Sequence, residues 1–277
     1  MATAALPPSS GTSSAPGMKG GRTVAATVET RGNLRVHLFG GPYVSVDGRR
    51  CPVPEGSKRL LAFVALRRGR IERRYVAGTL WPVGNDGRAA GNLRSALWRL
   101  RAAGIDVLYH DKWSLSLLGQ VRVDVHELQA WADRIIAGSP CAADLEPVRL
   151  ETEALDLLPG WYDDWTILER ERLRQRVLHA LEAQSQLLSE QGRHADAISA
   201  ALAAVMAEPL RESAQRALIE AHLAENNWAE AQRILHAYSA LLSRELGVAP
   251  SRELVCLIEY ARRRQERATP APAVARV

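Results

Sequence analysis

Residues 87–104 read GRAAGNLRSALWRLRAAG, a stretch with four arginines and no acidic residue. Leu93, Leu97 and Leu100 follow the i, i+4, i+7 spacing with which an amphipathic helix packs one face against a core. On such a helix, successive residues lie about 100° apart. That spacing places four polar side chains in one row on the outward side: Arg88, Asn92, Ser95 and Arg99.

The polar row has the residue types that read DNA. Arg and Asn make bidentate contacts with guanine and adenine edges in the major groove, and Ser can contact a base or a phosphate. We therefore predict that the four residues of the row contact bases. Arg94 and Arg101 flank the leucine stripe, and we predict that they contact backbone phosphates. The alternative is a charged face that is only solvated.

Trp98 lies at the edge of the predicted row. Its indole can pack on a neighbouring hairpin or touch the sugar-phosphate backbone of DNA, and the sequence favours packing. Lys58 and Arg59 open the preceding helix, where the helix dipole attracts phosphate. They are further candidate backbone contacts, with solvated surface side chains as the alternative.

The charge is divided unevenly along the chain. The 277 residues have a net charge of +5, but residues 34–124 carry +9 and residues 125–268 carry −7. This asymmetry predicts a front region that binds a polyanion and a rear region with another role.

Alternating apolar residues over 34–53 predict a small antiparallel sheet, with Asp47-Gly48 as a hairpin turn. Residues 57–69 predict a helix with Ser57 as its N-cap and Gly69 as its stop. A second helix over 72–81 ends at Pro82.

Asn85 or Asp86 can cap the helix of residues 87–104. Two alternating runs after Gly104 predict a hairpin with Lys112 at its tip, a candidate contact for the minor groove or its phosphates. Strands, three helices and a terminal hairpin in about 90 residues predict a winged helix-turn-helix.

Residues from 126 onward are predicted to be almost wholly helical, including 144–158 and a long run over about 163–191. GRHADA at 192–197 aligns with NNWAEA at 226–231, an offset of 34, which is the period of tetratricopeptide repeats. Three aromatic residues around the start of the long helix are predicted to be packing anchors and not a ligand cage: Trp161, Tyr162 and Trp165.

The predicted fold class is an α+β winged helix-turn-helix domain followed by an all-α, tetratricopeptide-like domain. We divide the chain into a disordered tail at 1–32, the winged-helix domain at 33–125, the helical domain at 126–266 and a second disordered tail at 267–277.

The sequence lacks the motifs of an enzyme. We find no phosphate-binding loop, no G-x-S-x-G, no H-E-x-x-H and no cysteine pair, so we predict no catalytic residues, no metal and no cofactor. No apolar run approaches the ~18 residues of a membrane span. We expect a cytoplasmic, nucleoid-associated protein.

The front segments LRVHLFGGPYVSVDGRR, KRLLAFVALRRGRI, VAGTLWP and NLRSALWRLR resemble the OmpR-type winged-helix domain of the SARP group, the antibiotic regulatory proteins of actinobacteria. The segment LLPGWYDDWTILERERLRQRVLHALE at 157–182 resembles the bacterial transcriptional activator domain that follows it in that group. The resemblance covers about residues 33–265 and indicates a small, two-domain member. The wing of the group usually has Gly-Tyr where this chain has Lys112-Trp113.

The resemblance implies an activator that binds direct repeats in double-stranded DNA and regulates antibiotic biosynthesis. It implies a homodimer formed through the helical domain and contacts with RNA polymerase through the sigma factor and the alpha subunit. In OmpR-type activators the polymerase contact is the loop before the recognition helix, which here corresponds to Val83, Gly84, Asn85, Asp86 and Gly87. The alternative is a tetratricopeptide-type adaptor with a non-specific basic domain.

Overall fold

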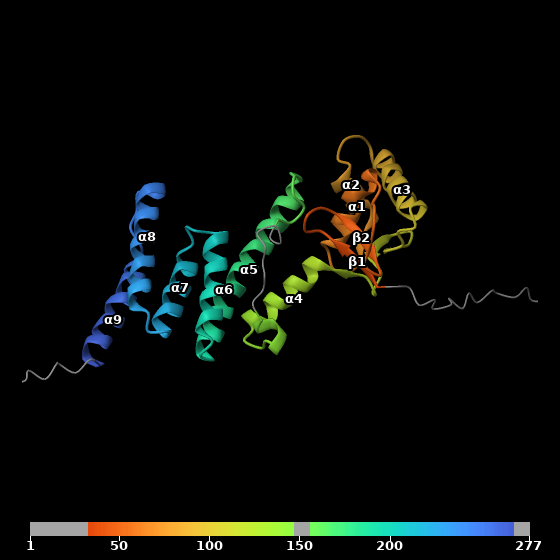
Figure 1. The fold of residues 1–277 in the computed structure, drawn as a ribbon. Coiled ribbons are helices and arrows are strands. Elements are labelled where there is room, and N and C mark those ends of the chain that lie inside the picture. The colour runs from red at the N-terminus through yellow and green to blue at the C-terminus, as the bar shows by residue number, and fades with distance from the viewer. Residues whose placement is uncertain (1–32, 147–155, 269–277) are drawn as a thin grey trace, which may run out of the picture. The chain divides into compact units, whose positions relative to one another are not determined.

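The computed structural model describes residues 33–146 and 156–268 (Figure 1). The front domain begins with three strands, β1 (Leu34–His37), β2 (Tyr43–Val46) and β3 (Arg49–Cys51). Asp47 and Gly48 both have positive φ (50° and 80°), which is the geometry of the predicted two-residue hairpin turn. Strand β7 (Arg122–Val123) pairs in parallel with β1 and completes a mixed four-stranded sheet.

Helix α1 (Glu55–Ala65) begins three residues before the start predicted with Ser57 as N-cap. Pro54 is the N-cap residue, and Ser57 is fully buried, where its hydroxyl donates a hydrogen bond to the carbonyl of Ala96 on α3 (2.8 Å). The N-cap prediction for Ser57 is therefore wrong, because the hydroxyl joins two helices instead of closing its own helix.

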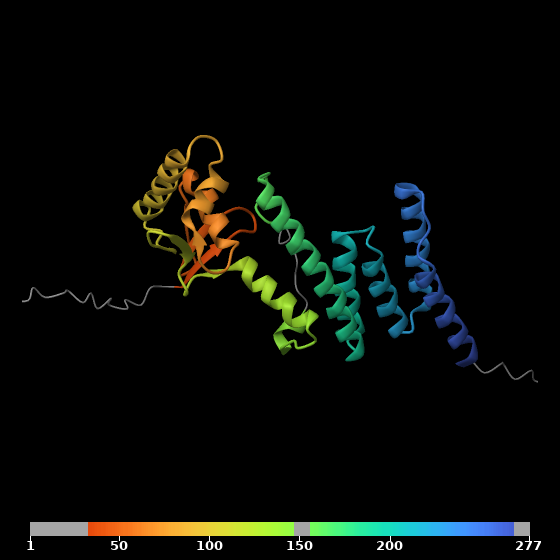
Figure 2. The same ribbon diagram turned by 180° about the vertical axis from the view of Figure 1, so that it is seen from behind.

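Helices α2 (Arg73–Leu80) and α3 (Asp86–Ala102) complete the helix-turn-helix. The Asn85 side chain accepts the backbone N–H of Arg88 (2.9 Å) and so caps α3, one of the two predicted caps. Leu93, Leu97 and Leu100 are all buried, together with alanines on the same face of α3. Figures 1 and 2 show α1, α2 and α3 grouped beside the first strands.

A second, antiparallel sheet forms the wing. Strands β5 (Leu108–His110) and β6 (Ser114–Leu117) make the predicted hairpin, and β4 (Ile71–Glu72) pairs with β6 on the other side. Strand β4 ends where α2 begins, so the wing is fixed directly to the first residue of α2.

The rear domain consists of α4 (Asp124–Ile136), a short 3₁₀ helix η1 (Ala142–Leu145), α5 (Asp164–Glu190), α6 (His194–Ala207), α7 (Glu212–Ala224), α8 (Trp228–Leu246) and α9 (Arg252–Ala268). Helices α6 and α8 begin 34 residues apart, as the repeat predicts. Consecutive helices from α4 to α9 pack on one another (Figure 2). This is the predicted fold class, a winged helix followed by tetratricopeptide-like helices.

Two expectations for the start of the rear domain are wrong. Leu157 forms an isolated β-bridge with Phe39 and is followed by a turn, so the end of the predicted 144–158 helix is not helical. Tyr162 is 81% exposed and anchors nothing, whereas the Trp165 ring packs edge-on against Phe63 of α1 at 5.2 Å between centroids.

Some predictions lie outside the described residues. These are the tail at 1–32, most of the predicted 144–158 helix and most of the tail at 267–277, although α9 itself extends to Ala268. No helix within the described ranges is long and apolar enough to span a membrane.

Candidate nucleic-acid interface

The outward face of α3 presents the predicted polar row to solvent. Arg88, Ser95 and Arg99 are exposed, and Asn92 is half-buried. Because the buried stripe includes Ala89 and Ala96 as well as the leucines, its centre differs from the one that the leucines alone define. The row therefore lies on one flank of the exposed face and Arg94 with Arg101 on the other.

Trp98 lies between these two flanks. It is 70% exposed, so the prediction that it packs on the hairpin is wrong. Together with Arg94, Ser95 and Arg99 it lines a shallow depression of about 360 Å³ on α3. A solvent-exposed indole at the middle of a basic helix face is available for contact with a partner.

Two glycines outside the polar row leave room for its arginines. A Cβ at Gly56, near the start of α1, would lie 2.7 Å from a terminal nitrogen of Arg99. Gly84 has φ of +114°, and a Cβ there would lie 3.1 Å from Cδ of Arg88. Gly56 has no signal of this role in the sequence, because only the tertiary structure brings it to α3.

None of the four arginines of α3 pairs with a carboxylate in the described part of the chain. Arg101 is within 2.8 Å of the His110 ring nitrogen on the wing. Burial lowers the pKa of His110, and the nearby Arg101 and Arg73 lower it further. The α3 face is therefore a surface of uncompensated positive charge, which favours a polyanionic partner.

The wing tip is held in shape by Asp111. Its carboxylate accepts the backbone N–H groups of Trp113 (2.8 Å) and Ser114 (2.7 Å), which lowers the pKa of Asp111. Lys112 is exposed, with its ammonium 5.1 Å from the centre of the Trp113 ring. Lys112 thus lies at the exposed tip of the wing, where the sequence predicts it.

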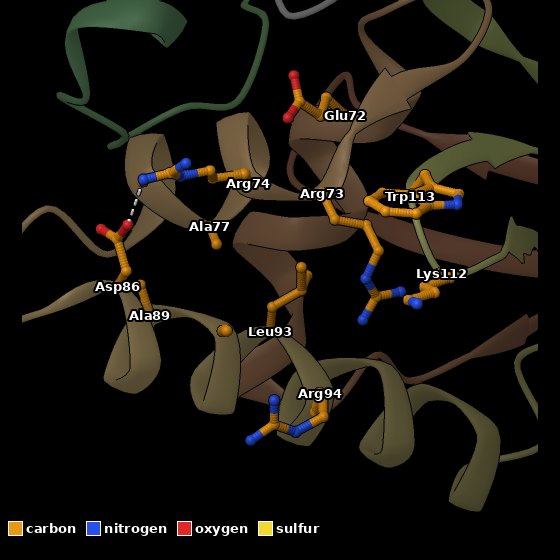
Figure 3. A pocket seen from close by; sticks show the side chains of 12 residues that line it. Glu72, Arg73, Arg74, Ala77, Asp86, Ala89, Leu93, Arg94, Lys112 and Trp113 are labelled. Atoms are coloured by element: carbon orange, nitrogen blue, oxygen red, sulfur yellow. Dashed lines mark hydrogen bonds and ion pairs between the residues drawn. The ribbon is translucent and has the colours of Figure 1, made fainter.

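A cavity of about 450 Å³ opens between α2, the first half of α3 and the wing (Figure 3). Small and apolar side chains of α2 and α3 line part of it, among them Ala77, Ala89 and Leu93. Four cationic side chains also line it: Arg73, Arg74, Arg94 and Lys112. Arg73, Arg74 and Trp113 are not among the DNA contacts predicted from the sequence. The two adjacent arginines that open the helix before the recognition helix were the available signal.

The two cations at the start of α1 have local partners. Lys58 pairs with Glu55 at 2.6 Å, and the Arg59 guanidinium pairs with Asp163, next to the first residue of α5. Arg59 therefore contributes to the contact between α1 and the start of α5, a use that its place in the sequence did not indicate.

The loop between α2 and α3 comprises residues 81–85 and is shifted by two residues from the predicted 83–87 segment, since Asp86 and Gly87 already belong to α3. Asp86 pairs with Arg74 of α2 at 2.7 Å. Val83 is 85% exposed. The loop thus exposes the apolar side chain of Val83, and the Asp86–Arg74 ion pair fixes the end of the loop that joins α3.

The rear half of the chain matches a known family. Residues 123–262, about half of the chain, match the bacterial transcriptional activator domain. The chain is 29% identical over 235 residues to the regulatory protein AfsR of Streptomyces coelicolor, covering 81% of this chain and 24% of that protein. It is 31% identical over 223 residues to AfsR of Streptomyces griseus, covering 76% and 22%. It therefore spans less than a quarter of the length of these curated relatives.

A solved structure has a similar fold. Mycobacterium tuberculosis EmbR, solved in complex with a low-affinity phosphopeptide, superposes with a TM-score of 0.62 at 21% identity. The match covers 84% of this chain and 65% of that one. The chain therefore belongs to the bacterial transcriptional activator family, in its SARP group of transcriptional regulators.

Proposed function

We propose that the protein is a sequence-specific DNA-binding activator, with residues 33–125 as its DNA-binding domain and residues 126–266 as its activator domain. The observation that carries this proposal is the α3 face, where the arginines have no carboxylate partner in the described part of the chain. Insertion of that face into the major groove would bring Arg88, Asn92, Ser95 and Arg99 to base edges. Arg94, Arg101 and Lys112 would then reach phosphates.

The further partners follow from the family resemblance. The loop that presents Val83 would contact RNA polymerase through its sigma factor, and the alpha subunit would be a second contact. The helical domain would hold two copies together on direct repeats. The target would be an antibiotic biosynthesis gene cluster, and the protein would act in the cytoplasm at the nucleoid.

The direct test is selection of bound duplexes from a random pool by the full chain. An enriched, repeated motif supports the activator. Affinity for that motif should fall by about 10³ to 10⁵ between 50 and 200 mM salt if ~6 to 10 phosphates are contacted. Binding without any enriched sequence would instead support the adaptor with a non-specific basic domain.

A further inference from the structure

A hollow of about 350 Å³ lies between α5 and α7 of the rear domain. Three small side chains line it, Ala183 from α5 and Ala217 and Ala221 from α7, and their size leaves the space between the two helices open. Figures 1 and 2 show α6 between these two helices in the row of the rear domain. The described lining residues include none of the predicted contacts with DNA or RNA polymerase.

The hollow has more negative charge than its own cations neutralise. The carboxylates of Glu182, Glu190 and Glu220 line it. Glu182 is neutralised by its ion pair with Arg211, at 2.6 Å. Glu190 and Glu220 form no ion pair in the described part of the chain. The guanidinium of Arg216 also lines the hollow and offsets the charge of one of these two carboxylates, so an excess of negative charge is left for a ligand.

The Glu220 carboxylate is the group that gains most from a cation. Its side chain is open to solvent, yet the surrounding protein desolvates the carboxyl enough to raise the pKa of Glu220, and the positive charge of Arg216 reverses only part of that rise. A carboxylate that has lost hydration is stabilised by a nearby positive charge. A bound cation would therefore replace the water that Glu220 has lost.

A buried hydroxyl without a partner lines the same hollow. Ser185 is only 1% exposed, and its hydroxyl makes no hydrogen bond in the described part of the chain. Buried polar groups in proteins are nearly always hydrogen-bonded. The Ser185 hydroxyl is thus an independent sign, besides the carboxylates, that a polar atom of a ligand belongs here.

A second hydroxyl lies opposite Glu220. The turns before and after α6 each reverse the chain, so α5 and α7 run in the same direction. The Ser213 hydroxyl donates a hydrogen bond to Glu182 (2.7 Å), which sets the register of the two helices. Seven residues, or about two turns, further along each helix, Ser189 and Glu220 lie opposite one another across the hollow.

We propose that this hollow binds a small organic amine through its primary ammonium group, with Glu220 as the counter-charge and the hydroxyls of Ser185 and Ser189 as further acceptors. An ammonium is a compact cation with three N–H donors, which matches one carboxylate and two hydroxyls. The volume is near the lower end of the roughly 300 to 1,000 Å³ of small-ligand pockets. The alanine side chains offer an apolar surface to a short hydrocarbon chain.

The test titrates the DNA-free full chain with butylamine and putrescine by isothermal titration calorimetry. The neutral 1,4-butanediol and the anionic succinate have similar length and serve as control ligands. We expect saturable binding of the amines alone. Glu220→Gln should bind them at least about tenfold more weakly, the size of one charge-assisted contact. Glu253→Gln makes the same change of charge at an exposed residue of α9, outside the hollow, and should bind as the wild type does.

Ser185→Ala separates a binding role from a structural one. We expect about tenfold weaker amine binding and a melting temperature no lower than that of the wild type, because the hydroxyl has no partner within the protein to lose. A lower melting temperature with unchanged amine binding would instead assign the Ser185 hydroxyl to the fold and contradict the proposal.

A lysine side chain of another protein would present the same ammonium group, so a lysine capped at both ends is titrated as well. Binding of the capped lysine without binding of the free amines would support the site and identify a partner protein as the source. The proposal is overturned if none of these amines binds, or if Glu220→Gln, folded by its melting temperature, binds them as the wild type does. The test contains no DNA, so its outcome does not depend on the proposed function.

Discussion

The arginines of α3 and those of the rear helices show one residue type in two different roles. In the rear domain Arg172, Arg176 and Arg233 each pair with a carboxylate, whereas Arg88, Arg94, Arg99 and Arg101 have none in the described part of the chain. An arginine whose charge is paired with a carboxylate stabilises the surface of its own domain. An arginine without such a pair is available to bind a partner. This difference is more informative than the number of lysines and arginines, which is 16 in residues 34–124 and 16 in residues 125–268.

The largest expected effect comes from removing three charges of α3 at once. The triple variant Arg88→Gln, Arg94→Gln and Arg101→Gln should bind its selected duplex about 10³-fold more weakly, since each lost contact costs ~1 to 3 kcal/mol. Its dependence of log affinity on log salt should become shallower by about 2, because Arg94 and Arg101 are the two phosphate contacts among the three. Fluorescence anisotropy over a salt series measures both quantities.

The matched control for this comparison is a rear triple variant with Arg172, Arg176 and Arg233 changed to Gln. It has the same change in net charge, and we expect wild-type DNA affinity because these side chains are already compensated. An equal loss of affinity in both triple variants would mean that DNA responds only to net charge, and the contrast between the two regions would be wrong.

Removing a carboxylate of the rear domain should reduce the stability of the fold, whereas removing the α3 arginines reduces DNA affinity. Glu182 accepts hydrogen bonds from Arg211 (2.6 Å) and Ser213 (2.7 Å), and the Glu182 and Arg211 side chains are only 15% and 16% exposed. Glu182→Ala would leave Arg211 without its counter-charge and should reduce the free energy of unfolding by about 2 to 3 kcal/mol. Thermal unfolding measures this cost.

Arg172→Gln is the control for that measurement, because its i, i+3 pair with Glu169 is exposed on the Arg172 side. Its melting temperature should change by no more than about a degree or two, as exposed pairs contribute little. A Glu182→Ala variant as stable as the control would show that the rear pairs are no more structural than the α3 arginines.

The position of α3 and most of its exposed basic face were predictable from the sequence. The spacing of Leu93, Leu97 and Leu100 located α3, and the polar loop before it offered Asn85 or Asp86 as its cap, of which the structure uses Asn85. The leucines alone did not give the centre of the exposed face, because the buried alanines at 89 and 96 rotate the core direction and bring Trp98 to the middle. Alanine is too small to carry a strong pattern, so its burial appears only in the structure.

Tertiary pairing was the second limit on prediction. Arg59 had the same local signals as a phosphate ligand, but Asp163, 104 residues later, binds it. The cavity beside α3 likewise needs β4 to pair with β6 before Arg73 meets the wing. Neither contact has a signal within one segment of the chain.

Within α3, the flank that carries the polar row should determine base preference, and the flank of Arg94 and Arg101 should determine affinity for DNA of any sequence. Asn92→Ala should remove the preference at one base position, with a discrimination loss of about 1 to 3 kcal/mol. Arg101→Ala should weaken binding about evenly across all sequences, because a phosphate contact carries no sequence information. Repeating the selection with each variant measures this. Equal loss of one base preference in both would contradict the assignment of the flanks.

The smallest expected effect concerns Trp98, between the two flanks. An exposed indole that faces the major groove can pack on the methyl group of thymine, which is worth less than about 1 kcal/mol. Replacing each thymine of the selected site by uracil should cost the wild type about twofold to threefold at one position. Trp98→Ala should be insensitive there. If the variant keeps the wild-type sensitivity at every thymine, Trp98 contacts the sugar-phosphate backbone instead, and the centre of the exposed face reads no base.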